Sequence, residues 1–121
     1  MSSKNTLVVG ASPKPSRYSN QAVSRLAENG HTVYAVGLRE GVISGISISK
    51  TWPARKEIDT VTLYLNPKHQ EDYYQGILEL NPKRVIFNPG TENPEFQTQL
   101  TQAGIEVEIA CTLVMLSIGN Y

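Results

Sequence analysis

Short apolar runs alternate with amphipathic stretches from one end of the chain to the other. Five of these runs have the length and composition of strands buried in a sheet: Leu7–Val9, Thr32–Val36, Thr60–Leu65, Arg84–Phe87 and Ile105–Ile109. Between them, apolar residues recur three and four positions apart, as Val23, Leu26 and Ala27 do, and this spacing predicts helices with one buried side. Residues 42–51 alternate only loosely and leave room for one short extra strand.

Residues that favour helix ends separate these segments. Ser19 is predicted to cap the first helix, because its hydroxyl can accept a hydrogen bond from a free amide of the first turn. Gly30 is predicted to end that helix. Asn66-Pro67 and Asn93-Pro94 each combine a capping asparagine with a proline, which suits the first helical position. Two further helices are therefore expected after the third and fourth predicted strands.

The regular alternation predicts a Rossmann-like α/β fold. Right-handed crossovers leave few topologies, and we predict a doubly wound parallel sheet of five strands in the order 3-2-1-4-5, with helices on both faces in three layers. Residues 1–121 are expected to form one domain, since this length supports a single core. Four turns then follow strand ends at the edge where open α/β sheets bind ligands: Gly10–Ser12, Gly37–Arg39, Leu65–Pro67 and Asn88–Gly90.

The turn after the first strand has the composition of a phosphate site. Gly10, Ala11 and Ser12 lie between a buried strand and a helix, where free amides and the positive end of the helix dipole favour an anion. The loop that follows carries Lys14 and Arg17. The full G-x-G-x-x-G pattern is absent, so a plain tight turn with two solvated cations is the alternative interpretation.

The tip of the second strand bears on which nucleotide would fit. A dinucleotide fold that binds NAD usually carries Asp or Glu there, for the ribose hydroxyls. This chain has Gly37, Leu38 and Arg39 instead. An arginine suits a phosphorylated ribose better than a free one, which favours CoA or NADP over NAD; an ordinary loop arginine is the alternative.

Composition excludes several classes of function. The 121 residues contain 11 Lys and Arg against 11 Asp and Glu, and this balance argues against nucleic acid as a partner. No apolar run approaches the length of roughly 20 residues that crosses a bilayer. The amino terminus has no apolar signal region, and the single cysteine excludes an internal disulfide framework. A soluble, cytoplasmic protein is expected.

Groups that could support catalysis are few. His31 begins a strand on the side away from the expected site and is interpreted as structural, whereas His69 lies near the expected site. Neither has a partner at metal-ligand or triad spacing, so no metal site and no catalytic residue is predicted. Cys111 follows the last strand and is interpreted as a small buried apolar residue; the alternative is a thiolate favoured by a position at a helix amino terminus. The apolar tail, residues 112–121, is predicted to cover the sheet edge or to form a homodimer contact.

These motifs together resemble a known family. VVGASPKPSR before a helix, then GH-V-YAVG, GVISG, a strand ending in LNP, and FNPG resemble the small stand-alone CoA-binding proteins. Those proteins are similar to the amino-terminal nucleotide-binding domain of succinyl-CoA synthetase alpha subunits. The synthetase subunits carry a second domain with a phosphorylated histidine, which this chain lacks, so the resemblance does not imply ligase activity.

The resemblance implies a set of ligand contacts. The diphosphate would be held by Gly10, Ala11 and Ser12 with Lys14 and Arg17 nearby, and the adenosine end would be flanked by Gly37, Leu38 and Arg39. The rest of the groove would be lined by Asn66, Pro67, Asn88, Pro89 and Gly90.

Two classes of function follow from these observations. The first is a CoA or acyl-CoA binding protein with no reaction of its own, because the chain has a phosphate turn and cations but no evident catalytic set. The alternative is a small enzyme or a regulatory subunit that uses an NADP-type or other nucleotide cofactor, with Cys111 or His69 taking part. A protein partner remains possible for either class and is not identified by the sequence.

Overall fold

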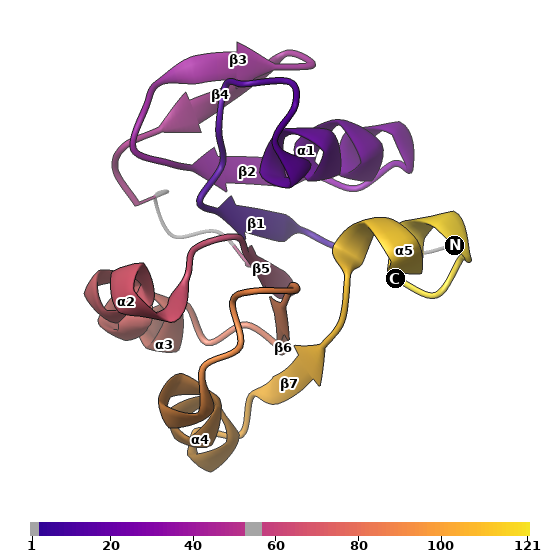
Figure 1. The fold of residues 1–121 in the computed structure, drawn as a ribbon. Coiled ribbons are helices and arrows are strands. Elements are labelled where there is room, and N and C mark those ends of the chain that lie inside the picture. The colour runs from indigo at the N-terminus through magenta and orange to yellow at the C-terminus, as the bar shows by residue number, and fades with distance from the viewer. Residues whose placement is uncertain (1–2, 53–56) are drawn as a thin grey trace.

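The computed structural model describes residues 3–52 and 57–121, which form a mixed sheet with helices on both faces (Figure 1). Its strands are β1 Thr6–Val9, β2 Val33–Val36, β3 Gly41–Ile43, β4 Ile46–Ser49, β5 Thr60–Leu63, β6 Arg84–Phe87 and β7 Glu106–Ile109. Its helices are α1 Tyr18–Glu28, α2 Pro67–Gln70, the 3-10 turn η1 Glu71–Tyr73, α3 Tyr74–Leu80, α4 Pro94–Gln102 and α5 Thr112–Ser117. The predicted α/β class is confirmed.

The strand count and the strand order differ from the prediction. The sheet has seven strands in the order β3-β4-β2-β1-β5-β6-β7, and all neighbours are parallel except β3 and β4. The prediction that residues 60–65 pair with the second strand is wrong, because β5 pairs with β1, with Thr60 opposite Thr6. The loosely patterned residues 42–51 form a hairpin instead, and β4 takes the place beside β2. With β4 counted as the third strand, the part β4-β2-β1-β5-β6 has the order 3-2-1-4-5, and β3 and β7 are added at the two edges of the sheet.

A tight turn creates this hairpin. Ser44 and Gly45 join β3 to β4, and both have positive φ angles, 49° and 81°. Two consecutive residues in this conformation match the right-handed twist of paired strands, which is why such turns connect hairpins. The hairpin strands are short, so their alternation of apolar and polar residues is too brief to predict a strand reliably.

Helices cover both faces of the sheet and so give the predicted three layers (Figure 1). On one face, Ile77 of α3 and the α4 residues Phe96 and Leu100 pack with apolar residues of the central strands. On the other face, Val23 of α1 and Leu116 of α5 pack against the same sheet. The strands β1, β5 and β6 are buried along their whole length, as parallel strands covered on both sides are.

Asparagine caps begin two helices as predicted, and one predicted cap is wrong. Asn66 accepts a hydrogen bond from the amide of His69, and Asn93 from the amide of Phe96, each with proline in the first turn. Ser19 is not the cap of α1, because the helix begins at Tyr18. The amide of Arg17 already closes a turn by donating to the carbonyl of Lys14 at 3.1 Å, so helical geometry starts before Ser19.

The carboxyl-terminal tail packs on a face of the sheet rather than along its edge. Met115 and Leu116 of α5 are buried beside α1, while Val114 and Ile118 are exposed. In the described part of the chain, no helix is long and apolar enough to cross a membrane.

Candidate functional site

A cleft of about 570 Å³ lies at the carboxyl edge of the central strands. It is formed by the loops that follow β1, β2, β5 and β6. Ten of the thirteen predicted site residues line it: Gly10, Ala11, Ser12, Lys14, Arg17, Gly37, Leu38, Arg39, Pro89 and Gly90. The volume lies within the range of roughly 300–1,000 Å³ that is usual for small-molecule sites.

The turn after β1 depends on glycine for both conformation and space. Gly10 has φ +94°, a region that side chains disfavour, and a Cβ there would lie 3.0 Å from Leu65 and from the backbone of Tyr64. The amides of Gly10 and Ala11 both donate to the carbonyl of Val36, at 2.8 and 2.9 Å. These two amides therefore hold the turn against β2 and are not free for a ligand.

Free donors are found instead at the start of α1. Arg17 occupies the cap position without a side-chain hydrogen bond to the helix. The amides of Tyr18, Ser19 and Asn20 have no hydrogen-bond partner among residues 3–52 and 57–121. Tyr18 and Ser19 line the cleft, so the positive end of the α1 dipole faces it. The helix start, more than the glycine turn, provides the backbone donors that an anion would use.

Gly37 explains why no acidic residue stands at the tip of β2. A Cβ at this position would lie 2.1 Å from the carbonyl oxygen of Ala11, far inside any allowed contact. The amide of Gly37 donates to the carbonyl of Ser49 on β4, so the backbone cannot move away without breaking a sheet bond. No side chain fits at position 37, and a carboxylate that would bind ribose hydroxyls is excluded by space alone.

Three cationic side chains stand at the rim of the cleft. Lys14, Arg17 and Arg39 are exposed, and none of the three makes a side-chain hydrogen bond or ion pair with any residue that the structure describes. No Asp or Glu is among the described residues that line the cleft. An electrically balanced chain thus keeps a local excess of positive charge, which attracts anionic ligands.

The other half of the cleft, at β5 and β6, contains residues that sequence reasoning did not assign to the site. Tyr64 and Leu65 follow β5, Tyr73 comes from η1 and Thr91 follows Gly90. Leu65 begins the predicted turn Leu65–Pro67 but was not among the expected ligand contacts, and Tyr64 could have been found from its place at the carboxyl end of the same predicted strand. Burial raises the pKa of the Tyr64 phenol well above its usual value, so this hydroxyl stays protonated at neutral pH.

Asn66, Pro67 and Asn88 are predicted site residues that do not line the cleft. Asn66 and Pro67 begin α2. Asn88 is buried beneath the cleft, where its side-chain amide donates to Thr62 and to the carbonyl of Leu63, and its side-chain oxygen accepts from the amide of Thr112. Its position indicates a role in joining β5, β6 and α5.

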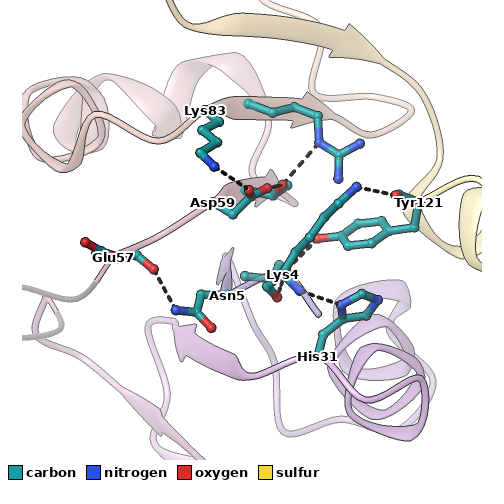
Figure 2. Close-up of polar contacts among 10 residues, drawn as sticks. Lys4, Asn5, His31, Glu57, Asp59, Lys83 and Tyr121 are labelled. Carbon is teal, nitrogen blue, oxygen red and sulfur yellow. Dashed lines mark hydrogen bonds and ion pairs between the residues drawn. The ribbon is translucent and has the colours of Figure 1, made fainter. Parts of the chain in front are cut away.

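The histidines and the cysteine are separated in the fold. His69 lines the cleft. His31 lies at the opposite edge of the sheet, where its Nδ1 accepts a hydrogen bond from the amide of Lys4 at 3.0 Å (Figure 2). Cys111 occupies the cap position of α5 but is not among the described residues that line the cleft. Among the described residues there is no group of three or more His, Cys, Asp and Glu that could hold a metal ion.

The fold and the cleft define a class of protein: a doubly wound α/β protein with a cationic cleft at the point where the strand order reverses, between β1 and β5. Comparison with protein families identifies the family within this class. The family described as "CoA binding domain" matches residues 4–117, and the chain belongs to that family. A comparison with curated proteins found no match.

Solved structures of similar proteins have the same fold as this chain. The crystal structure of an uncharacterised protein is 48% identical, with all of both chains covered and a TM-score of 0.96. A hypothetical protein from Pyrococcus horikoshii OT3 is 28% identical over 96% of this chain and 83% of its own, with a TM-score of 0.86. Cell-free ID.343 from Thermus thermophilus is 25% identical over 98% of this chain and 91% of its own, with a TM-score of 0.84.

Proposed function

We propose that this chain is a single-domain CoA or acyl-CoA binding protein with no reaction of its own. The family match supports CoA as the ligand. The observation that carries the proposal is the combination of unpaired cations with an uncapped helix start at one cleft. Lys14, Arg17 and Arg39 together with the first-turn amides of α1 suit the phosphates of CoA, because charge-assisted hydrogen bonds are strongest where no protein carboxylate competes.

The contacts divide along the cleft. The phosphates would lie over the Gly10–Ser12 turn and the start of α1, with Arg39 beside the phosphorylated ribose. The pantetheine chain would continue past Pro89 and Gly90 toward Tyr64 and the loops after β5 and β6. Asn66, Pro67 and Asn88 would support these loops instead of touching the ligand, which changes the role that the sequence resemblance implies for them.

The alternative is an NADP-type cofactor in a small enzyme or a regulatory subunit. Arg39 is the observation that keeps this alternative, since a ribose phosphate is common to NADP and CoA. His69 lines the cleft and is the residue that such an enzyme would use.

A cytoplasmic location belongs to the same proposal and is supported by the use of one cysteine. A homodimer through the exposed residues Val114 and Ile118 remains part of the proposal as well.

Thermal unfolding and calorimetric titration with CoA, 3′-dephospho-CoA, NADP and NAD test the proposal. A ligand at 100 times its dissociation constant stabilises the folded state by about 2.7 kcal/mol, which shifts the melting temperature measurably. We expect CoA to give the largest shift and NAD a smaller one, and 3′-dephospho-CoA to bind more weakly than CoA. A shift with NAD equal to that with CoA would reject the proposal, and a larger shift with NADP would favour the alternative. Incubation with acetyl-CoA, followed by a thiol assay, should show no release of free CoA.

A further inference from the structure

A buried glutamine lies between the two loops that form the β5 and β6 half of the cleft. Gln70 is the last residue of α2, and none of its surface is exposed to solvent. Burying a side-chain amide is unfavourable unless its polar atoms find partners, so the partners of such a residue indicate what it does.

Gln70 connects the two loops directly. Its Nε2 donates to the carbonyl of Leu65 at 2.8 Å and to the carbonyl of Thr91 at 2.7 Å. Leu65 follows β5 and Thr91 follows β6, and both line the cleft. One side-chain nitrogen therefore fixes the distance between two segments that are separated by more than twenty residues in the chain.

A second amide completes the arrangement. Asn93 donates from its Nδ2 to Oε1 of Gln70 at 3.0 Å and to the hydroxyl of Tyr74 at 2.7 Å, while its Oδ1 accepts the amide of Phe96 at the start of α4. Both donor positions on each amide nitrogen are thus used. The two loops are connected through buried side-chain amides whose N–H donors are all hydrogen-bonded. Neither loop can therefore move without leaving a buried polar atom unpaired.

We propose that Gln70 is a positioning residue for the ligand: it holds the loops after β5 and β6 at the separation that binds the pantetheine part of CoA. This inference rests on the proposed function. The cations Lys14, Arg17 and Arg39 belong to the loops after β1 and β2, whereas the described side-chain hydrogen bonds of Gln70 go to Leu65, Thr91 and Asn93. Loss of the Gln70 bonds should therefore weaken binding of whole CoA and leave binding of its phosphorylated adenosine part intact.

Gln70→Glu removes the two hydrogen bonds that the side chain donates to the carbonyls of Leu65 and Thr91. The introduced carboxylate keeps an oxygen to accept from Asn93 but loses both donors and faces two carbonyl oxygens. At pH 8 we expect CoA to bind at least about tenfold more weakly to this variant, and adenosine 3′,5′-bisphosphate to bind within about twofold of wild type. As the pH falls to 5.5, the introduced carboxyl takes up a proton and can donate again, so the difference in CoA affinity between variant and wild type should narrow.

Calorimetric titrations of both ligands between pH 5.5 and 8 measure this, with thermal unfolding in parallel. Gln102→Glu makes the same chemical change at an exposed position on α4 and should match wild type at every pH. If Gln70→Glu does not fold, Gln70→Met removes the donors without adding charge and should show the same selective loss without the pH dependence. An equal loss for both ligands, or an unchanged CoA affinity, would overturn the positioning role while leaving the proposed function standing. Failure of wild type to bind CoA would overturn both.

Discussion

Cationic side chains lie at both edges of the sheet, but in the described part of the chain those at the amino edge have partners and those at the rim of the cleft do not. At the amino edge, Lys4 donates to the backbone oxygen of Tyr121, and Lys83 pairs with Asp59 at 3.9 Å (Figure 2). The guanidinium of Arg84 donates to the hydroxyl of Thr60 and pairs with Glu108. The Tyr121 ring packs against this cluster, 4.7 Å from the Arg84 guanidinium. At the carboxyl edge, the rim cations have no partner in the described part of the chain.

The difference separates two uses of charge. Paired cations at the amino edge connect the beginning of the chain, the sheet and the segment after α5, so they contribute to stability. Unpaired cations at the carboxyl edge contribute nothing to stability that the structure shows and are available to a ligand. Substitutions at the two edges should therefore have opposite effects on stability and on binding.

The largest effect is expected where the carboxyl edge also depends on backbone geometry. Gly10→Val places a branched side chain at φ +94°, 3.0 Å from Leu65 and from the backbone of Tyr64. We expect a loss of about 3 kcal/mol in unfolding free energy and a loss of more than about a hundredfold in CoA affinity. Chemical unfolding and calorimetry measure the two quantities.

Gly30→Val is the matched control for this substitution. Gly30 also has a positive φ, +85°, but a Cβ there would contact nothing within 4 Å. It should lower stability through the backbone strain alone and leave CoA affinity unchanged. Wild-type affinity in a folded Gly10→Val variant would mean that the ligand binds elsewhere.

At the amino edge, Arg84→Met should reduce stability without affecting binding. The Arg84 side chain is only 9% exposed, and its removal takes away the ion pair of Glu108 and the hydrogen bond that the Thr60 hydroxyl accepts. We expect a loss of about 2–3 kcal/mol in unfolding free energy and unchanged CoA affinity. Lys83→Met is the control, because that side chain is 85% exposed and its pair with Asp59 should be worth less than about 1 kcal/mol. Weaker CoA binding in Arg84→Met would show that the two edges are not independent.

Arg17→Ala should give the reverse result. Removing one charge-assisted contact should weaken CoA binding by roughly 1.5–3 kcal/mol, or about tenfold to a hundredfold, with stability within about 0.5 kcal/mol of wild type. Arg25→Ala, an exposed arginine further along α1, controls for the loss of one positive charge. Equal affinity losses in both variants, measured at the same salt concentration, would reduce the role of Arg17 to general attraction.

The smallest expected effect is a pH dependence of stability that arises from His31 at the amino edge. Burial, then the charges of Lys4 and Arg84, lower the pKa of His31 from its ordinary value of 6.5, and Asp59 acts in the opposite direction. The unfolded chain therefore binds a proton here more readily than the folded chain, so stability is lost as the pH falls below about 6.5. Melting temperatures between pH 7.5 and 5 should fall further for wild type than for His31→Gln, which cannot titrate. Melting temperatures that fall equally with pH in both proteins would contradict the assignment of this pH dependence to His31.

What the sequence predicts well are features that local chemistry decides. The buried strands, the asparagine caps and the four carboxyl-edge turns each have a direct signal in a few adjacent residues. Residues 42–51 were expected to hold at most one short extra strand, and the hairpin of β3 and β4 was not predicted because its strands are too short for a clear period, although Ser44-Gly45 is a turn signal. Because the hairpin was not predicted, residues 60–65 were placed beside the second strand instead of beside β1, and the predicted strand order was wrong.

Most of the residues predicted to contact the ligand line the cleft, whereas the supporting roles of buried polar residues were not predicted. Ten of the thirteen predicted residues line the cleft: eight come from the loops after β1 and β2, and the other two are Pro89 and Gly90. Gln70 and Asn88 are polar, and polarity normally indicates a surface position, yet both are buried and act through carbonyls of distant loops. Such roles depend on which strands become neighbours, which no short stretch of sequence contains.

The contact between positions 37 and 11 limits how this protein can change its ligand preference. Because the Ala11 carbonyl fills the space that a side chain at Gly37 would need, an acidic residue for an unphosphorylated ribose cannot be the first step of a redesign. The turn after β1 must be rebuilt before it, and that step breaks the bonds from Gly10 and Ala11 to Val36. The two changes are strongly epistatic. A mutational route from this cleft to one that prefers NAD therefore passes through unstable intermediates, and a library that varies position 37 alone should yield few folded members.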